Sequence, residues 1–207
     1  MTDEACIAAA PVVCGIMQRA RARCVPAILL TLLLAGCAAQ LPAADIEKID
    51  RVLALIQQRL GYMDDVARNK WNSGAPIEDL PREREIIAGI GQRAAGYGLD
   101  AGIAQDFFRA QIEASKVIQN MRFSEWRVQS QPPFRNLPDL RDEIRPALDA
   151  LTPAMMNALA AALPVLRAPG APGVVDARAA AIATGVSAAA PALETAVAPL
   201  KRISSPR

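Results

Sequence analysis

The sequence predicts an all-α fold, a helical bundle with one long N-terminal helix and additional helices toward the C-terminus. Alanine is abundant and aromatic residues make up only 4% of the 207 residues, a composition that favours helices over a sheet. From Asp45 onward, apolar residues recur three and four positions apart, which is the period of an amphipathic helix. A chain of this length and apolar content can form one domain with a buried core and an appended tail.

The charge balance and the lack of histidine exclude several classes of function. The chain has 23 lysine and arginine residues and 21 acidic residues, and the two kinds are interleaved, so no basic surface for nucleic acid is expected. Histidine, the commonest general base and neutral metal ligand, does not occur in the sequence. Any chemistry must therefore rest on other side chains.

Residues 1–37 are typical of a secretory signal. Three arginines precede the apolar run Val25–Leu34, and small residues follow this run. The run is too short to be favoured as a transmembrane span. Met17, directly before the arginines, is an alternative start of the protein. We therefore expect an exported protein, located in the periplasm or anchored to a membrane.

The signal ends in Leu34-Ala35-Gly36-Cys37, which resembles a bacterial lipobox. In that interpretation Cys37 becomes the lipidated first residue of the mature protein, and the lipid tethers the domain to a membrane that no segment crosses. Ordinary cleavage near Ala39, without a lipid, is the alternative. All four cysteines lie within the first 37 residues, so the body of the protein cannot contain a disulfide.

The first predicted helix of the body runs from Asp45 to near Trp71. Lys70 lies on the continuation of its apolar stripe. Arg59, eleven positions earlier, lies about three turns or roughly 16 Å away on nearly the same side of the helix. These two long cationic side chains can therefore lean toward one point between them.

The second predicted helix begins after a turn at residues 72–76, where Asn, Ser, Gly and Pro are concentrated. Asp79 is well placed as its N-cap. This start places Arg82 and Glu83 in the first helical turn, and Gly98 is the expected stop.

The third predicted helix is capped by Asp100 and runs to about Arg127. Ser115 and Gln119 are four positions apart and share the face of its apolar residues, so both should point inward. A buried glutamine needs partners for both ends of its amide. Either another chain segment or a ligand must supply them.

A proline-containing linker, Gln129–Pro138, precedes the fourth predicted helix, which Asp139 can cap. This helix carries Arg141 and Arg145. Pro146 disfavours helical geometry at the residue before it, so we expect a kink or a helix that begins afresh at Pro146.

The helical domain is expected over residues 38–167. Residues 168–207 are rich in alanine and proline, and they form either short packing helices or a partly ordered tail.

Four segments carry a resemblance to a known family: QQRL–GYMDDVARNKW, APIEDLPRERE, QIEASKVIQNMRFSEW and PDLRDEIRPALDAL. They resemble the secreted, all-helical chorismate mutases of the periplasmic gamma subclass, over roughly residues 45–152. The resemblance implies a chorismate mutase-like helical bundle that rearranges chorismate, within one molecule, to prephenate. That reaction transfers no proton and forms no covalent intermediate, so the resemblance implies no cofactor and no metal.

The resemblance also implies roles for individual residues. Arg59 and Arg145 would clamp carboxylates of the substrate, with Arg82 at the basic end of the pocket, because arginine pairs with a carboxylate through two bonds. Lys70 would reach a carboxylate and the ether oxygen, and Gln119 would donate to the same oxygen. Lys70, Gln119 and Arg82 are therefore the expected catalytic residues.

Three further residues complete the implied binding set. Asp79, through its backbone, and Glu83 would hold the ring hydroxyl, and Ser115 would support a carboxylate. Arg141 is the rival of Arg145, because the linker before them can shift the register by a residue. In this subclass each chain would hold its own complete site, and a homodimer is among the expected assemblies.

Two other functions fit the same scaffold. A non-catalytic helical envelope lipoprotein would keep the lipobox and the apolar stripes but would not need Arg59, Lys70 and Gln119 to converge. A module that binds a small carboxylate without converting it would keep the cations but lose Lys70 or Gln119. Both residues are present, which favours the enzyme.

Overall fold

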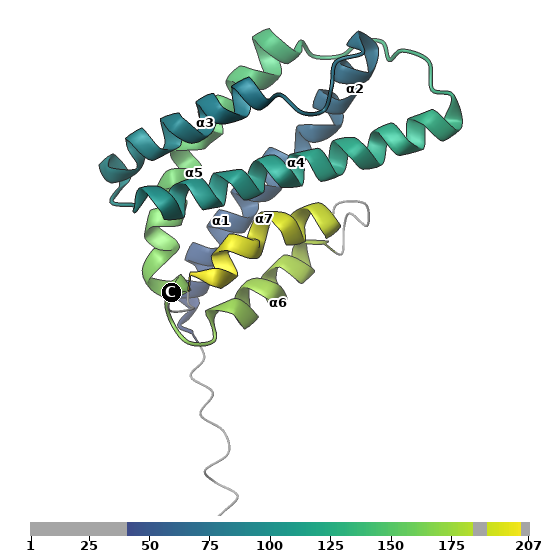
Figure 1. Cartoon of the computed structure of the whole chain (residues 1–207). Coiled ribbons are helices and arrows are strands. Elements are labelled where there is room, and N and C mark those ends of the chain that lie inside the picture. The colour runs from purple at the N-terminus through teal and green to yellow at the C-terminus, as the bar shows by residue number, and fades with distance from the viewer. Residues whose placement is uncertain (1–40, 184–189, 204–207) are drawn as a thin grey trace, which may run out of the picture. The chain divides into compact units, whose positions relative to one another are not determined.

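A computed structural model describes residues 41–183 and 190–203, and these residues form helices and connecting turns without a strand (Figure 1). The predicted all-α fold is therefore confirmed. The expected signal, with Met17 and Cys37, lies outside the described residues, as do residues 184–189 and 204–207.

The predicted long N-terminal helix consists of two segments, α1 (Ala43–Gly61) and α2 (Met63–Ser73). Tyr62 between them keeps a helical backbone, and its N–H bonds to the carbonyl of Arg59 at 3.3 Å. Glycine has a low helix propensity, so Gly61 weakens the helix where the two segments meet. α2 ends at Gly74, whose φ of 66° is in the left-handed region.

The second and third helices begin at the predicted caps. The carboxylate of Asp79 accepts from the N–H of Arg82 at the start of α3 (Leu80–Arg93), and Asp100 does the same for α4 (Ala101–Gln129). A 3₁₀ turn, η1 (Ala94–Tyr97), separates the end of α3 from Gly98.

The linker after α4 is held against α2 by side chains. The indole of Trp71 donates to the carbonyl of Gln131 at 3.1 Å. The amide of Asn72 donates to the carbonyl of Phe134 at 2.9 Å and accepts from its N–H at 2.8 Å. Phe134 also packs on Trp126 of α4, with 4.7 Å between the ring centroids. The linker therefore has a fixed path to the next helix.

The fourth helical stretch starts with a π-helical turn, η2 (Leu140–Ile144), which Asp139 caps as predicted, and continues as α5 (Arg145–Leu166). The expected change of geometry is thus present, but the α-helix starts at Arg145, one residue before Pro146. Proline is tolerated in a first turn because its missing N–H would have no helical partner there.

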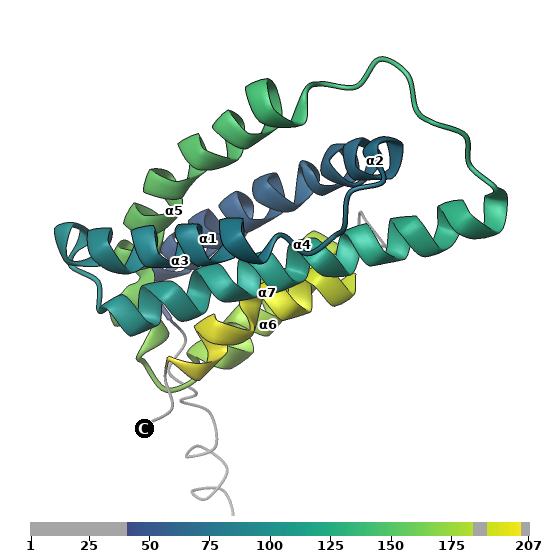
Figure 2. The same ribbon diagram turned by 45° about the horizontal axis from the view of Figure 1, so that its top comes forward.

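α4 lies at the centre of the fold, with α2 and α3 packed against it, and α1 packs along α5 (Figures 1 and 2). The segment Leu140–Leu166 is long and apolar enough to cross a membrane by length and composition. In the fold it is a core helix, because Met155, Met156 and Leu159 are fully buried.

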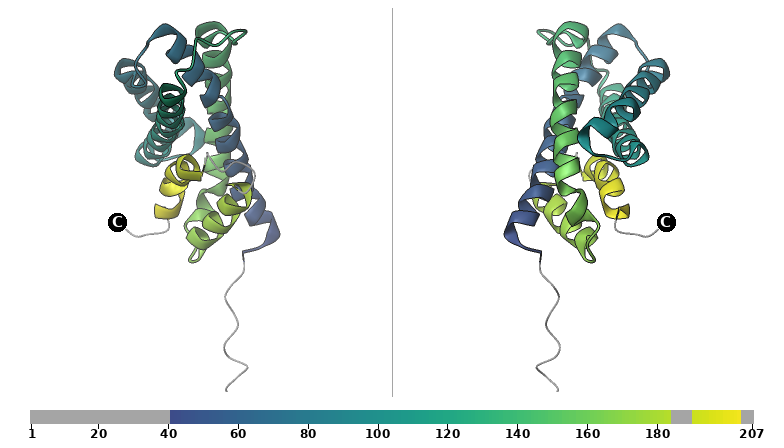
Figure 3. Two further views of the ribbon diagram at one scale, coloured as in Figure 1. Left: turned by 90° about the vertical axis from the view of Figure 1, so that its right-hand side faces the viewer. Right: turned by 90° about the vertical axis from the view of Figure 1, so that its left-hand side faces the viewer.

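The C-terminal region forms two packing helices, α6 (Ala171–Ala183) and α7 (Ala190–Arg202), over its described residues. α7 runs beside α4 in all views (Figure 3). The side-chain amide of Gln111, inside α4, donates to the carbonyl of Ala196 in α7 at 2.9 Å. α7 thus belongs to the core.

Candidate active site

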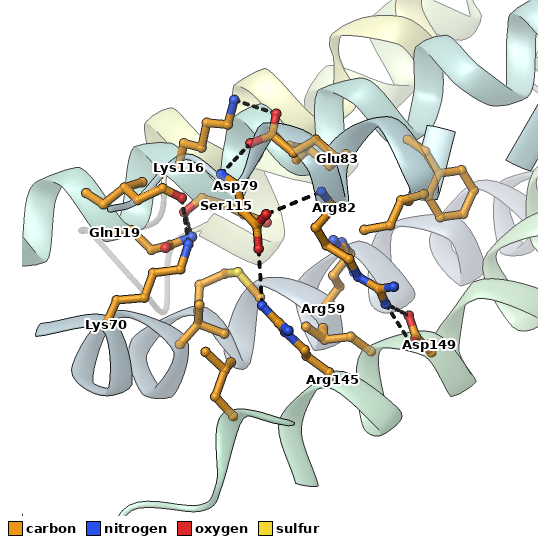
Figure 4. A pocket seen from close by; sticks show the side chains of 18 of the residues that line it. Arg59, Lys70, Asp79, Arg82, Glu83, Ser115, Lys116, Gln119, Arg145 and Asp149 are labelled. Atoms are coloured by element: carbon orange, nitrogen blue, oxygen red, sulfur yellow. Dashed lines mark hydrogen bonds and ion pairs between the residues drawn. The ribbon is translucent and has the colours of Figure 1, made fainter. Parts of the chain in front are cut away.

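A cavity of about 120 Å³ lies between α1, α2, α3, α4 and α5 (Figure 4). All eight site residues expected from the sequence line it: Arg59, Lys70, Asp79, Arg82, Glu83, Ser115, Gln119 and Arg145. Arg141 is exposed and is not among the lining residues. The fold therefore brings together side chains that are separated by up to 86 positions in the chain.

Two buried cations come from the N-terminal helices. Arg59 is 8% exposed, and its Nε has no hydrogen-bond partner among the described residues. Burial lowers the pKa of Arg59 to about 10, although the negative charge of Asp149 acts to raise it. Lys70 is also 8% exposed, and its Nζ donates to the carbonyl of Ile77 at 2.6 Å. Burial lowers the pKa of Lys70 as well, opposed mainly by Asp79. Buried cations of this kind favour an anionic ligand.

The α4 face of the cavity carries two buried polar side chains. The hydroxyl of Ser115 donates to the carbonyl of Gln111 at 2.7 Å. The amide nitrogen of Gln119 donates to the carbonyl of Ser115 at 3.1 Å, while its amide oxygen has no partner among the described residues. The helix backbone thus supplies one of the partners that a buried glutamine needs. An amide nitrogen has two hydrogens, so a second donor remains for a ligand.

Two ion pairs connect the start of α3 with α5 on the other side of the cavity. Arg145 Nη2 lies 3.2 Å from Asp79 Oδ2. Arg82 Nη2 lies 3.0 and 2.9 Å from the two carboxylate oxygens of Asp149. Asp149 was missed by the sequence analysis, although it follows Arg145 by four positions and so shares its helix face.

Lys116 is the second residue that the sequence analysis missed. Its side chain is 13% exposed, and Nζ lies 2.9 Å from Glu83 and 3.0 Å from Glu113. Glu83 in turn accepts from the N–H of Asp79 at 3.2 Å. Its position directly after the inward-facing Ser115 could have indicated that Lys116 lies at the edge of the cavity.

The charges around the cavity do not cancel. Five cationic and three anionic side chains line it, which leaves an excess of two positive charges: Arg59, Lys70, Arg82, Lys116 and Arg145 against Asp79, Glu83 and Asp149. Most of the remaining lining is apolar, including Val66, Phe108 and Ile112. A compact dianion with an apolar body would match this lining.

A second cavity, of about 900 Å³, lies between α1, α2, α4, α6 and α7. Arg122 is the one cation among its described lining residues, and it is paired with Asp64 and Glu125. This cavity therefore lacks the positive excess of the first. No group of histidine, cysteine or acidic side chains suited to hold a metal occurs in residues 41–183 and 190–203.

Comparison with known proteins identifies similar sequences and structures. The family model for chorismate mutase type II matches residues 43–120. The secreted chorismate mutase of Mycolicibacterium smegmatis is 36% identical over 112 residues, which are 54% of this chain and 61% of the relative. The chorismate mutase of Methanocaldococcus jannaschii is 33% identical over 81 residues, which are 39% of this chain and 82% of the relative.

Among solved structures, the chorismate mutase of Burkholderia thailandensis is similar with a TM-score of 0.70 and 36% sequence identity. The similarity covers 74% of this chain and 98% of that one. This chain thus spans almost the whole of a solved relative but only about three fifths of the secreted mycobacterial one. The Mycolicibacterium smegmatis relative is a secreted protein, and this similarity supports the expectation that the present chain is exported.

Proposed function

The chain belongs to the chorismate mutase family, and from this membership we propose that it is an isomerase that converts chorismate to prephenate. The observation that carries the proposal is the cavity itself. Its lining has an excess of two positive charges, and buried donors on three different helices face it. Chorismate has two carboxylates and an apolar ring, so its charge and shape complement such a lining.

The proposed reaction breaks the ether C–O bond of chorismate and forms a C–C bond between its side chain and its ring. All electrons and atoms stay within the substrate. An enzyme for this step must fold a flexible dianion into the reactive conformer and place donors where negative charge develops, which is at the ether oxygen. Side chains that are already fixed before the substrate arrives do both at low cost.

Arg59 and Arg145 are proposed to hold the two carboxylates, with Arg82 at the mouth of the cavity. The absence of a protein partner for Arg59 Nε, in a buried position, supports this role. Glu83, the backbone of Asp79 and Ser115 are proposed to fix the ring hydroxyl and one carboxylate.

Lys70 and Gln119 are proposed to donate to the ether oxygen. Their donor groups come from α2 and α4 and face the same cavity (Figure 4). An acceleration of about a millionfold needs about 8 kcal/mol of differential stabilisation, and one preorganised donor supplies roughly 3–4 kcal/mol. The two donors together would supply most of the required stabilisation.

The test is to add chorismate to the purified protein and to follow the loss of chorismate and the appearance of prephenate. We expect turnover far above the uncatalysed rate, and expect Lys70→Ala to abolish it while the helical circular dichroism spectrum is kept. A protein that binds chorismate without converting it would instead be a carboxylate-binding module. A protein that neither binds nor converts chorismate would fit the envelope lipoprotein.

We further propose that the protein works outside the cytoplasm, tethered to a membrane by a lipid on Cys37. The signal-like residues 1–37 and the secreted relative support this location. Labelling of cells with a fatty-acid probe should mark the wild-type protein and not Cys37→Ala. In this proposal each chain carries its own complete site, so a homodimer would contain two of them.

A further inference from the structure

Two ion pairs join α3 to α5 in a reciprocal pattern across the cavity. On α3, Asp79 precedes Arg82 by three positions, and on α5, Arg145 precedes Asp149 by four. Each acid on one helix therefore meets a base on the other. The Arg145 pair joins two residues already assigned to the site, whereas Asp149 has been given no part in the proposed reaction.

Asp149 is the acidic partner of Arg82 that lies on another helix. The Arg82 side chain is 29% exposed, so solvent would leave its long stem free to change rotamer. Glu85 also pairs with Arg82, at 3.0 Å, but it lies three positions away on the same helix and bonds to Nη1 through one oxygen. Both acids are largely exposed, Glu85 at 70% and Asp149 at 61%, so the geometry of the pair and not its burial distinguishes Asp149. Asp149 holds Arg82 from a second helix, with both carboxylate oxygens within 3.0 Å of Nη2 (Figure 4).

The position of Arg82 matters for binding because a mobile arginine loses its rotamer freedom when it pairs with a ligand. An arginine that is held in place before binding has already lost that freedom. Glu85 engages Nη1 of Arg82 and Asp149 engages Nη2, so Nε has no acceptor among the described residues and can donate to a ligand. Asp149 can thus hold the guanidinium and leave it available to a carboxylate.

We propose that Asp149 is a positioning residue: it holds the Arg82 guanidinium at the cavity mouth so that Arg82 binds a substrate carboxylate without further ordering. This inference rests on the proposed chorismate mutase activity. Asp149 itself does not contact the substrate. Its carboxylate also lies near enough to Arg59 to oppose the effect of burial on that side chain.

The first test compares the kinetics of two variants. Asp149→Ala removes both acceptors, and we expect KM to rise about three- to tenfold with a smaller change in kcat, because ordering one long side chain at binding has a cost of that size. Asp149→Asn keeps an oxygen that can accept from Nη2, so its KM should stay closer to that of the wild type. Asp50→Ala is the matched control. It removes another Asp–Arg pair between helices, with Arg178, away from the cavity.

A double-mutant cycle shows whether Asp149 acts through Arg82. In an Arg82→Gln protein, Asp149→Ala should change KM no further. An equal change in both backgrounds, or an unchanged KM in Asp149→Ala, would overturn the proposal.

A spectroscopic measurement makes the result independent of turnover. NMR of the arginine side chains should show slow rotation of the Arg82 guanidinium in the wild type and in Asp50→Ala, and fast rotation in Asp149→Ala. Fast rotation in the wild type, or the same rate in wild type and Asp149→Ala, would refute the anchoring. A wild-type protein that shows the expected NMR difference but no conversion of chorismate would instead refute the proposed function.

Discussion

At Arg59 the demands of stability and of ligand binding oppose each other. Its side chain is buried, and its Nε has no protein partner among the described residues. A buried cation without a full set of partners destabilises a fold. Burial lowers the pKa of Arg59 from 12.5 to about 10 in the folded protein. The folded state therefore carries the free-energy cost of the buried charge at neutral pH, and this cost disappears only as the pH rises from about 10 toward 12.5.

Replacing Arg59 with methionine should therefore stabilise the protein and inactivate it. Methionine fills similar apolar space without a charge, and we expect the free energy of unfolding to rise by about 1–3 kcal/mol at neutral pH. Thermal and urea denaturation measure the gain, and the chorismate assay measures the loss. Arg68→Met, at a half-buried arginine with two acidic partners, is the control and should not stabilise. A less stable Arg59→Met protein would contradict this account of the site.

The pH dependence of activity should differ between the acidic and alkaline sides. Gln119 does not titrate, so kcat/KM should stay flat from mildly acidic to neutral pH, and Gln119→Glu should introduce a loss of activity toward neutrality. Because the pKa of Lys70 is lowered, its charge is lost at a lower pH than that of an ordinary lysine, and kcat/KM should fall there. A bound dianion favours the charged lysine, so kcat should fall at a higher pH than kcat/KM. A wild-type activity that declines steeply toward neutrality would contradict the role of Gln119.

Secondary structure elements are placed by local signals, and two glycines, one at the end of α1 and one just after α2, show how. Gly74 ends α2 with φ of 66°, a conformation that glycine adopts without strain. Its position lets the N–H of Ala75 bond to the carbonyl of Lys70 at 3.0 Å. Gly61, at the end of α1, has an ordinary helical backbone, and an added Cβ would meet nothing within 4 Å.

The same substitution should therefore have opposite effects at these two positions. Gly74→Ala should lower the free energy of unfolding by about 1 kcal/mol, because alanine disfavours the left-handed region. Gly61→Ala should raise it by about 0.5–1 kcal/mol, because alanine is the better helix former and joins α1 to α2 more firmly. Urea unfolding of the two variants measures both changes. A lower free energy of unfolding for Gly61→Ala would show that alanine does not fit the backbone at Gly61, and a higher one for Gly74→Ala would contradict the cost of the left-handed conformation there.

The sequence predicts a feature well when the residues that determine it are close together in the chain. Asp79, Asp100 and Asp139 were identified as caps because a cap involves only the next few residues. The pairing of Asp149 with Arg82 was not identified, because 67 positions separate them and no local pattern records that contact. Likewise Lys116, read alone, is an ordinary surface lysine of α4.

The C-terminal region is a part of the fold whose structure the sequence left open. Its alanines give little contrast between a buried and an exposed face, so periodicity could not decide between helices and a tail. Over the described residues the structure has helices here, and α7 packs along α4, the helix whose Ser115 and Gln119 line the cavity (Figure 1). Ser115 bonds to the backbone of Gln111, and Gln111 bonds to α7. The support of the site thus extends to residues near the C-terminus.

Leu200→Ala tests this support. Leu200 is 1% exposed in the core, and we expect its truncation to lower the free energy of unfolding by about 2–4 kcal/mol. Val128→Ala, at a residue that is 88% exposed, should change it by less than about 0.5 kcal/mol. Both values come from urea denaturation of the whole protein. A neutral Leu200→Ala variant would mean that α7 is not part of the cooperative fold.

The positive excess around the cavity is larger than the formal net charge of the expected mature chain, because residues 1–37 carry three basic and two acidic side chains and residues 38–207 have a net charge of only +1. All other side chains of residues 38–207 together carry a net charge of −1, so the attraction that the molecule exerts on anions is concentrated at the cavity mouth. A doubly negative molecule diffusing nearby is guided to that mouth instead of to the surface at large. Dissolved ions screen this electrostatic attraction over a distance of roughly 10 Å at 0.1 M ionic strength. Rising salt should slow the capture of the substrate and leave its conversion, once bound, unchanged.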